Sequence, residues 1–177
     1  MKNHLTLLSL TILTFALSAC QPDEEITQEE NHLKVLLHQK QWQVTAMTAM
    51  PSDSSATQDW YARLPDCVRD NVFITEAPGT GTVGELHAEE ATIRCASGDL
   101  SYHPHIAGWK LNDTHDIFSV DLFDTGHRML YGYELEPSYH TENWQVDILD
   151  EQIWQVQVRK IRDSAEYDVT LRFQAIP

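Results

Sequence analysis

The sequence is poor in positive charge and has no apolar segment long enough to cross a bilayer. It carries 12 lysines and arginines against 27 aspartates and glutamates, a formal net charge of −15. Nucleic acids and anionic lipid surfaces both attract basic patches, so this balance excludes them as electrostatic partners. The apolar stretch at 5–17 is shorter than the roughly 20 residues that a membrane-spanning helix needs. An acidic surface would instead suit a basic protein partner.

The sequence also lacks the motifs of common enzymes. It has no Gly-x-Ser-x-Gly elbow, no His-Glu-x-x-His pair and no glycine-rich phosphate loop. Carboxylates are numerous, but Asp70, Asp121, Asp124 and Glu134 fall on expected strands or strand ends, where a solvent-facing side chain is the norm. We therefore expect no enzymatic activity and no cofactor.

The N-terminal segment has the order of a bacterial secretion signal. Lys2 supplies a positive charge, the stretch 5–17 is apolar without an acidic residue, and a Leu-Ser-Ala-Cys tetrapeptide then ends at Cys20. The tetrapeptide resembles the lipobox of bacterial lipoproteins, in which a peptidase cleaves before the cysteine and the thiol receives diacylglycerol. This resemblance implies a signal peptide over 1–19 and a palmitate-bearing lipid anchor on Cys20.

The lipobox resemblance also implies a location. Gln21 follows the cysteine where an aspartate would resemble the retention signal of the inner membrane, so the expected location is the bacterial outer membrane. Whether the protein faces the periplasm or the cell surface stays open. Residues 20–31 are acidic and polar and are expected to form a flexible tether, which leaves 32–177 as one domain.

Only three cysteines are present, and Cys67 and Cys95 remain once Cys20 is assigned to the lipid. Because the cell envelope is oxidising, we predict a disulfide that closes a loop of about thirty residues and contributes ~3 kcal/mol. The alternatives are a thiolate metal site and a catalytic cysteine. The sequence has no Cys-x-x-Cys spacing to favour either of them.

Most of the domain alternates between apolar and polar residues, which predicts antiparallel strands with one buried face. A short amphipathic helix, marked by leucines at 33, 36 and 37, precedes them. The alternation assigns Ala46 to the same buried face as Trp42, and Ile148 to the same buried face as Trp144. Strands are expected over 42–46, 71–75, 80–86, 91–95, 107–111, 118–122, 128–135, 144–148, 154–158 and 167–175.

Turn sequences join the expected strands one after another, for example at 78–81 and 124–126. About eight to ten strands in succession avoid exposed edges by closing into a barrel or by stacking as two sheets. We predict an all-β fold, an up-and-down antiparallel β-barrel, with a β-sandwich as the alternative. The irregular stretch 50–65 would lie over the open end of the barrel. Its Trp60 and Tyr61 would either meet a ligand or pack on the rim.

The order of these landmarks resembles the lipocalin-like lipoproteins of bacteria. A short helix and Trp42 come first, followed by Cys67, a Gly-Thr-Gly turn at 79–81, Cys95 and the Trp-x-Leu strand of Trp109. The sequence lacks the glycine that the Gly-x-Trp pattern of lipocalins places before Trp42. The resemblance implies a lipocalin-like barrel that binds a small hydrophobic or amphiphilic ligand.

Aromatic residues are the candidate ligand contacts. Alternation puts four tryptophans on the inward faces of their strands, and it puts Tyr131 and Tyr133 on one face of the expected strand at 128–135. In a lipocalin-type barrel such side chains line a cavity, whereas in a filled barrel they form the core. The candidate set is Trp42, Trp60, Tyr61, Trp109, Tyr131, Tyr133, Trp144 and Trp154.

Two histidines suggest a metal site. His103 and His105 flank a proline and lie on the same side of an extended segment, about 7 Å apart. With His87 or His115 as a third ligand, they would bind zinc or copper. The alternative is that they are exposed loop histidines of an acidic protein.

These features leave three functions open, none of them enzymatic. The first is a membrane-anchored lipoprotein whose barrel binds a small hydrophobic or amphiphilic ligand. The second is an acidic inhibitor or immunity-type lipoprotein that binds a basic protein. The third is a metal-binding lipoprotein centred on His103 and His105.

Overall fold

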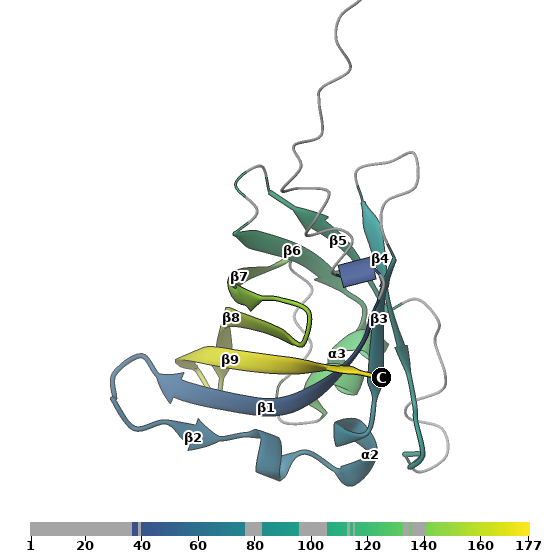
Figure 1. The fold of residues 1–177 in the computed structure, drawn as a ribbon. Helices are drawn as coiled ribbons and strands as arrows, with labels where there is room; N and C mark the ends of the chain where they lie inside the picture. The colour runs from purple at the N-terminus through teal and green to yellow at the C-terminus, as the bar shows by residue number, and fades with distance from the viewer. Residues whose placement is uncertain are drawn as a thin grey trace, which may run out of the picture.

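Eight antiparallel strands close into a barrel in the computed structural model, which describes residues 37, 38, 40–76, 83–95, 106–112, 114, 116–132, 135 and 141–177. Each barrel strand pairs with the next along the chain, and β1 pairs with β9 to close the circle (Figure 1). The barrel strands are β1 (Gln41–Pro51), β3 (Val72–Glu76), β4 (Gly84–Glu89), β5 (Ala107–Leu111), β6 (Ile117–Leu122), β7 (Glu142–Leu149), β8 (Ile153–Arg162) and β9 (Ala165–Ile176).

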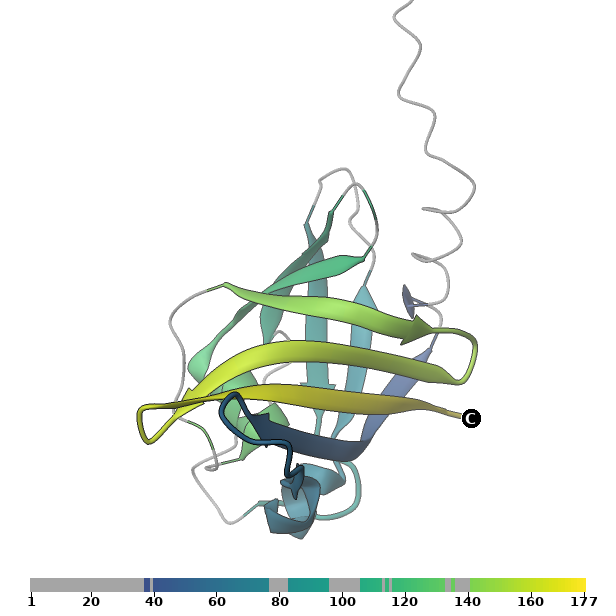
Figure 2. The same ribbon diagram turned by 90° about the vertical axis from the view of Figure 1, so that its left-hand side faces the viewer.

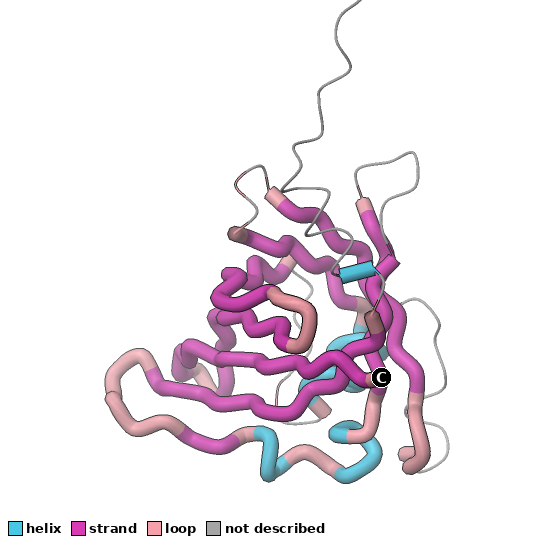
Figure 3. The backbone as a smooth tube through the Cα atoms, in the orientation of Figure 1, coloured by secondary structure: helices cyan, strands magenta, loops and turns pink. Residues whose placement is uncertain are grey.

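The all-β prediction, an up-and-down antiparallel barrel, is therefore confirmed, and the β-sandwich alternative is not adopted. Helical structure in the described residues is short: Leu37 and His38, the 3-10 helix η1 (Tyr61–Arg63), α2 (Asp66–Arg69) and α3 (Asp124–Tyr131). Strands make up most of the described backbone (Figure 3). No helix among the described residues is long and apolar enough to cross a membrane.

A long pairing joins β1 to β9 and closes the barrel, from Gln41 opposite Ile176 to Pro51 opposite Tyr167. Figure 2 shows these two strands running side by side along one wall. A bulge between Val44 and Ala46 shifts the register of β1. Because a bulge inserts one residue, the alternation changes phase, and Met47 and Ala49 point inward instead of Ala46. The inward assignment of Ala46 was therefore wrong.

A second bulge corrects another assignment. The pairing of β7 with β8 shifts between Val146 and Ile148. Trp144, before the bulge, is fully buried, whereas Ile148 is 37% exposed. Ile148 therefore does not share the inward face of Trp144.

The first half of the strand expected over 128–135 belongs instead to the helix α3, which begins at Asp124 and ends at Tyr131. The Asp-Thr-Gly sequence at 124–126 begins this helix rather than turning a hairpin. Gly132 ends it with a φ of +61°, a left-handed conformation that suits glycine, and its N–H donates to the carbonyl of Arg128. The apolar side of α3 is buried, because Met129, Leu130 and Tyr131 are at most 1% exposed.

The strand expected over 91–95 is not a strand. Thr92 and Ile93 donate their backbone N–H groups to the carboxylate of Asp70, at 2.6 Å each, rather than to a neighbouring strand. The strand expected over 80–86 is β4, which begins at Gly84 and continues to Glu89. Residues 80–82 lie outside the described part of the chain.

The two ends of the barrel are built from different elements. The "mouth" is where Lys40, just before β1, meets the β7–β8 turn at 150–152 and the end of β9. The "floor" is formed by α3 at the other end of β7 and β8, with α2 packed against it. Asn71 joins barrel and floor, since its side-chain amide donates to the carbonyl of Met129 at 2.9 Å.

Candidate functional site

The four strand tryptophans lie inside the barrel, as the alternation predicts, and each is at most 2% exposed. They pack on one another and on inward phenylalanines, with ring centroids from 4.5 Å for Trp154–Phe173 to 6.2 Å for Trp144–Phe173. Such spacings are those of direct aromatic packing. The ring contacts within this set join Trp42, Trp109, Phe118, Trp144, Trp154 and Phe173. In the described interior these rings contact each other, as core residues do.

Trp60 and Tyr61 lie beside the far end of β1. The short strand β2 (Gln58–Asp59) pairs with Thr48 and Ala49 and brings Trp60 to the end of the closing strands, beside Tyr167. There Trp60 is fully buried, and its ring lies 5.0 Å from that of Tyr167. The Arg69 guanidinium lies 5.6 Å from the ring of Tyr61. These contacts match the alternative in which the two aromatics pack on the rim.

Tyr131 belongs to a buried polar cluster that the sequence analysis did not identify. Glu142 and Lys160 form a buried ion pair across β7 and β8. The Glu142 carboxylate also accepts hydrogen bonds from the Tyr131 hydroxyl and from Nε1 of Trp144, both at 2.9 Å. Lys160 Nζ lies 4.2 Å from the centre of the Tyr131 ring. The sequence contained one sign that a charge is buried here, because Lys160 continues the inward series 154, 156 and 158 along β8. Tyr133, which was expected beside Tyr131, lies outside the described residues.

Burial governs the ionisation of this cluster. It lowers the pKa of Lys160, although the neighbouring Glu142 carboxylate acts in the opposite direction. It raises the pKa of the Tyr131 hydroxyl, with the charge of Glu142 adding to the effect. His127, whose ring centroid lies 4.8 Å from that of Tyr131, has its pKa lowered to about 3 by burial and by the charge of Lys160. Its imidazole is therefore neutral near pH 7.

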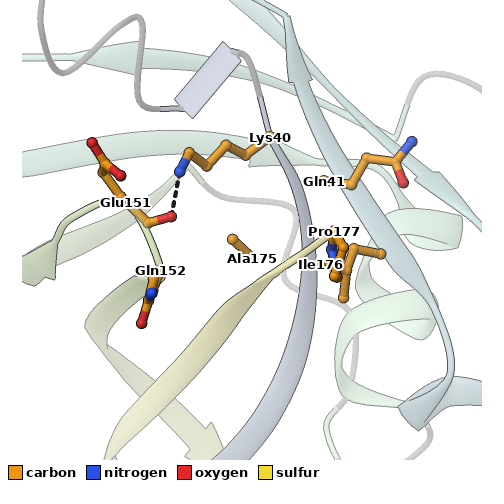
Figure 4. Close-up of a pocket in the computed structure, with 7 residues that line it drawn as sticks. All are labelled: Lys40, Gln41, Glu151, Gln152, Ala175, Ile176 and Pro177. Carbon is orange, nitrogen blue, oxygen red and sulfur yellow. Dashed lines mark hydrogen bonds between the residues drawn. The ribbon is translucent and has the colours of Figure 1, made fainter.

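An open cavity of about 650 Å³ lies at the mouth of the barrel (Figure 4). Its lining joins segments that are far apart in sequence: Lys40, Gln41, Glu151, Gln152, Ala175, Ile176 and Pro177. Lys40 reaches across the opening and donates from Nζ to the carbonyl oxygen of Glu151. Ala175, Ile176 and Pro177 supply the apolar part of the wall, so the cavity offers polar and apolar contacts side by side.

The β7–β8 turn that forms one wall of the cavity is held by a single carboxylate. Asp150 accepts hydrogen bonds from the backbone N–H groups of Gln152 at 2.7 Å and Ile153 at 2.8 Å. These two bonds lower the pKa of Asp150, and the positive charges of Lys40 and Arg172 add to the effect. The turn therefore keeps its shape, and its negative charge, at neutral pH.

The predicted metal ligands are only partly described. His103, His105 and His115 lie outside the described residues. His87 is described, and it lies on β4 beside two carboxylates that the sequence analysis did not include. Its Nε2 is 3.2 Å from Glu85 and 3.7 Å from Glu76. These three residues form a group whose ligand atoms lie within 4.8 Å of one another.

The predicted disulfide is confirmed. Cys67 on α2 is bonded to Cys95, with a Cα–Cα distance of 5.1 Å. It ties α2 to the segment that follows β4, next to the two hydrogen bonds that Asp70 accepts from Thr92 and Ile93. Cys20, the expected lipid attachment site, lies outside the described residues.

No protein-family model matches the sequence, and no curated protein is significantly similar to it.

Proposed function

We propose that this protein is a non-enzymatic, membrane-anchored lipoprotein that binds a small amphiphilic molecule at the mouth of its barrel. The observation that carries the proposal is the open cavity of about 650 Å³ there. Small-molecule sites commonly have volumes of roughly 300–1,000 Å³ and combine an apolar wall with a few polar groups. The barrel interior is the less suitable place, because Trp42, Trp144 and Trp154 pack against one another inside it.

The cavity lining suggests how the ligand would lie. An apolar chain or ring would rest on Ala175, Ile176 and Pro177, and a polar head would meet the Lys40 ammonium and the Gln41 and Gln152 amides. Lys40 already donates a hydrogen bond across the opening to the carbonyl oxygen of Glu151. A ligand head group would replace this acceptor, so the ammonium would keep a hydrogen-bond partner when the ligand binds. An amphiphile satisfies both parts of this lining.

The binding experiment uses the full chain extracted from membranes in mild detergent. Native mass spectrometry looks for a co-purifying amphiphile, and titration with a fluorescent fatty-acid probe measures affinity. Gln152→Trp fills the cavity from an exposed turn and should weaken probe binding at least tenfold. Gln174→Trp, an exposed position on β9 outside the cavity lining, should leave binding unchanged. Equal binding by both variants, or no binding by the natural chain, would contradict the proposal.

The membrane anchor has a separate test. If Cys20 carries the lipid, Cys20→Ala should remain an unacylated precursor with its N-terminal segment intact, and the natural chain should partition into membranes. Finding the natural chain soluble and unacylated, as read by mass spectrometry, would exclude the lipoprotein assignment without affecting the cavity.

A second candidate function is binding of a basic protein. It is favoured by the formal net charge of −15 and by a described interior filled with the protein's own aromatic rings. In that case the amphiphile titrations should fail. A purified basic partner should then bind with an affinity that falls steeply as salt rises.

A further inference from the structure

Two glutamates and a histidine converge on the outer face where β3 pairs with β4. Glu76, the last residue of β3, lies directly opposite Glu85 in the register, and His87 lies opposite Ile74. Since side chains two residues apart on a strand share a face, His87 is the diagonal neighbour of Glu76 on the side that carries Glu85. The local pairing of the sheet, and not a flexible loop, therefore brings the three groups together.

We propose that Glu76, Glu85 and His87 form a binding site for a first-row divalent cation, with Zn²⁺ as the representative ion. In a zinc tetrahedron with metal–ligand bonds of about 2.0–2.1 Å, neighbouring ligand atoms are about 3.3–3.4 Å apart. The distances from His87 Nε2 to the two carboxylates, 3.2 and 3.7 Å, bracket that value. Small rotations of the two exposed carboxylates would complete three ligand positions.

The charge pattern gives a second reason for a cation here. Like charges directly opposite each other on adjacent strands destabilise a sheet, and Glu76 faces Glu85 in that arrangement. A divalent ion between them converts the repulsion into attraction. The imidazole nitrogen sets the class of metal, because nitrogen ligands favour zinc and its neighbours over calcium and magnesium.

Exposure of the site suits reversible binding. The side chains of Glu76 and Glu85 are 57% and 53% exposed, whereas that of His87 is 16% exposed. The histidine thus provides a fixed ligand, and the two carboxylates are open to an ion arriving from solvent. A fourth position on the solvent side would take water or a group from another molecule. The site is separate from the mouth cavity, which is lined by other residues.

The test is zinc titration of the full chain, purified without a polyhistidine tag. Isothermal titration calorimetry should give one zinc equivalent, and His87→Gln should weaken its binding at least tenfold. Ca²⁺ and Mg²⁺ should bind much more weakly than Zn²⁺. Glu166→Gln, an exposed carboxylate on β9, is the matched control and should bind zinc like the natural chain.

A stability measurement distinguishes a metal site from a general effect of substitution. Zinc should raise the melting temperature of the natural chain by mass action. Glu85→Gln should abolish that rise and yet should not lower the melting temperature without zinc, because it removes a like-charge pair. The proposal is overturned if zinc binds His87→Gln as tightly as the natural chain. It is equally overturned if binding is lost only in His103→Gln/His105→Gln.

Discussion

At the scale of single residues, the most costly feature is the buried ion pair between Glu142 and Lys160. Removing two charges from water is expensive, and the pair is retained because each charge has a partner within the cluster. The carboxylate is also satisfied by Tyr131 and Trp144, so three neighbours depend on Glu142. The cluster fixes α3 against β7 and β8 through directional bonds, which apolar packing alone would not provide.

Removing one charge of this pair should be strongly destabilising. Lys160→Met leaves the Glu142 carboxylate buried without its counter-ion and should lower the free energy of unfolding by about 3–5 kcal/mol. Arg159→Met is the matched control, since Arg159 is 69% exposed and its ion pair with Asp168 lies at the surface; it should change stability by less than about 1 kcal/mol. Urea unfolding measures both. If both variants lowered the free energy of unfolding by the same amount, the buried ion pair would contribute no more to stability than the surface ion pair.

His127 should make the fold sensitive to acid. The unfolded chain binds a proton on this residue near the ordinary histidine pKa of 6.5, whereas the folded chain binds it only near a pKa of about 3. Between these values the unfolded state holds more protons, so stability falls as the pH drops from about 6.5 towards 3. His127→Gln cannot bind this proton, and its stability should decline less, by a few kcal/mol over that range. Parallel pH profiles of unfolding for the two proteins would contradict this explanation.

At the scale of elements, α3 depends on close approach to the segment before β5. A Cβ on Gly126 would lie 2.5 Å from the carbonyl oxygen of Ile106 and 2.9 Å from its Cβ. Gly126→Ala should therefore destabilise the protein by about 1–3 kcal/mol, although alanine is the better helix former. Gly108→Ala on β5 is the control, because its Cβ would only meet Val83 at 3.4 Å. Thermal unfolding should separate the two, and an unaffected Gly126→Ala would mean that α3 can move away from Ile106.

The disulfide acts on another element, the junction of α2 with the segment after β4. Cys67 and Cys95 close a loop with a sequence separation of 28, and constraint of the unfolded chain should give the bond about 2–4 kcal/mol. Cys67→Ser/Cys95→Ser should lower the free energy of unfolding by that amount. In the natural chain, alkylation of both cysteines should require denaturant together with reductant. Rapid labelling of the native protein, as read by mass spectrometry, would show that the bond does not form.

At the scale of the whole molecule, the barrel is closed by β1–β9 and filled by aromatic rings. Trp144 contacts Phe118, Trp154 and Phe173, with centroid distances of 5.9–6.2 Å. Trp144→Ala should therefore cost about 3–5 kcal/mol in the free energy of unfolding, since the cavity it leaves has rigid walls. Its affinity for an amphiphile at the mouth should not change. A loss of ligand affinity without loss of stability would instead place the ligand inside the barrel, among the tryptophans.

Those features of the protein that depend on local pattern could be predicted from the amino-acid sequence. Alternation placed Trp42, Trp154 and Phe173 on the inward face, and the succession of strands favoured a closed barrel because open edges are costly. The sequence also predicted the disulfide, because two cysteines remained for an oxidising compartment. These properties follow from periodicity and residue count, which a linear sequence displays directly.

Features that depend on contacts between different strands and helices became visible only in the folded protein. The bulges that redirect Ala46 and Ile148 come from register with facing strands. The helix α3 formed where the sequence suggested a strand, because its apolar side packs against the barrel and α2. The ion pair of Glu142 with Lys160, the mouth cavity, and the meeting of Glu76 with His87 each join different strands. Spacing along the sequence does not encode such meetings, because the pairing and register of different strands bring these residues together.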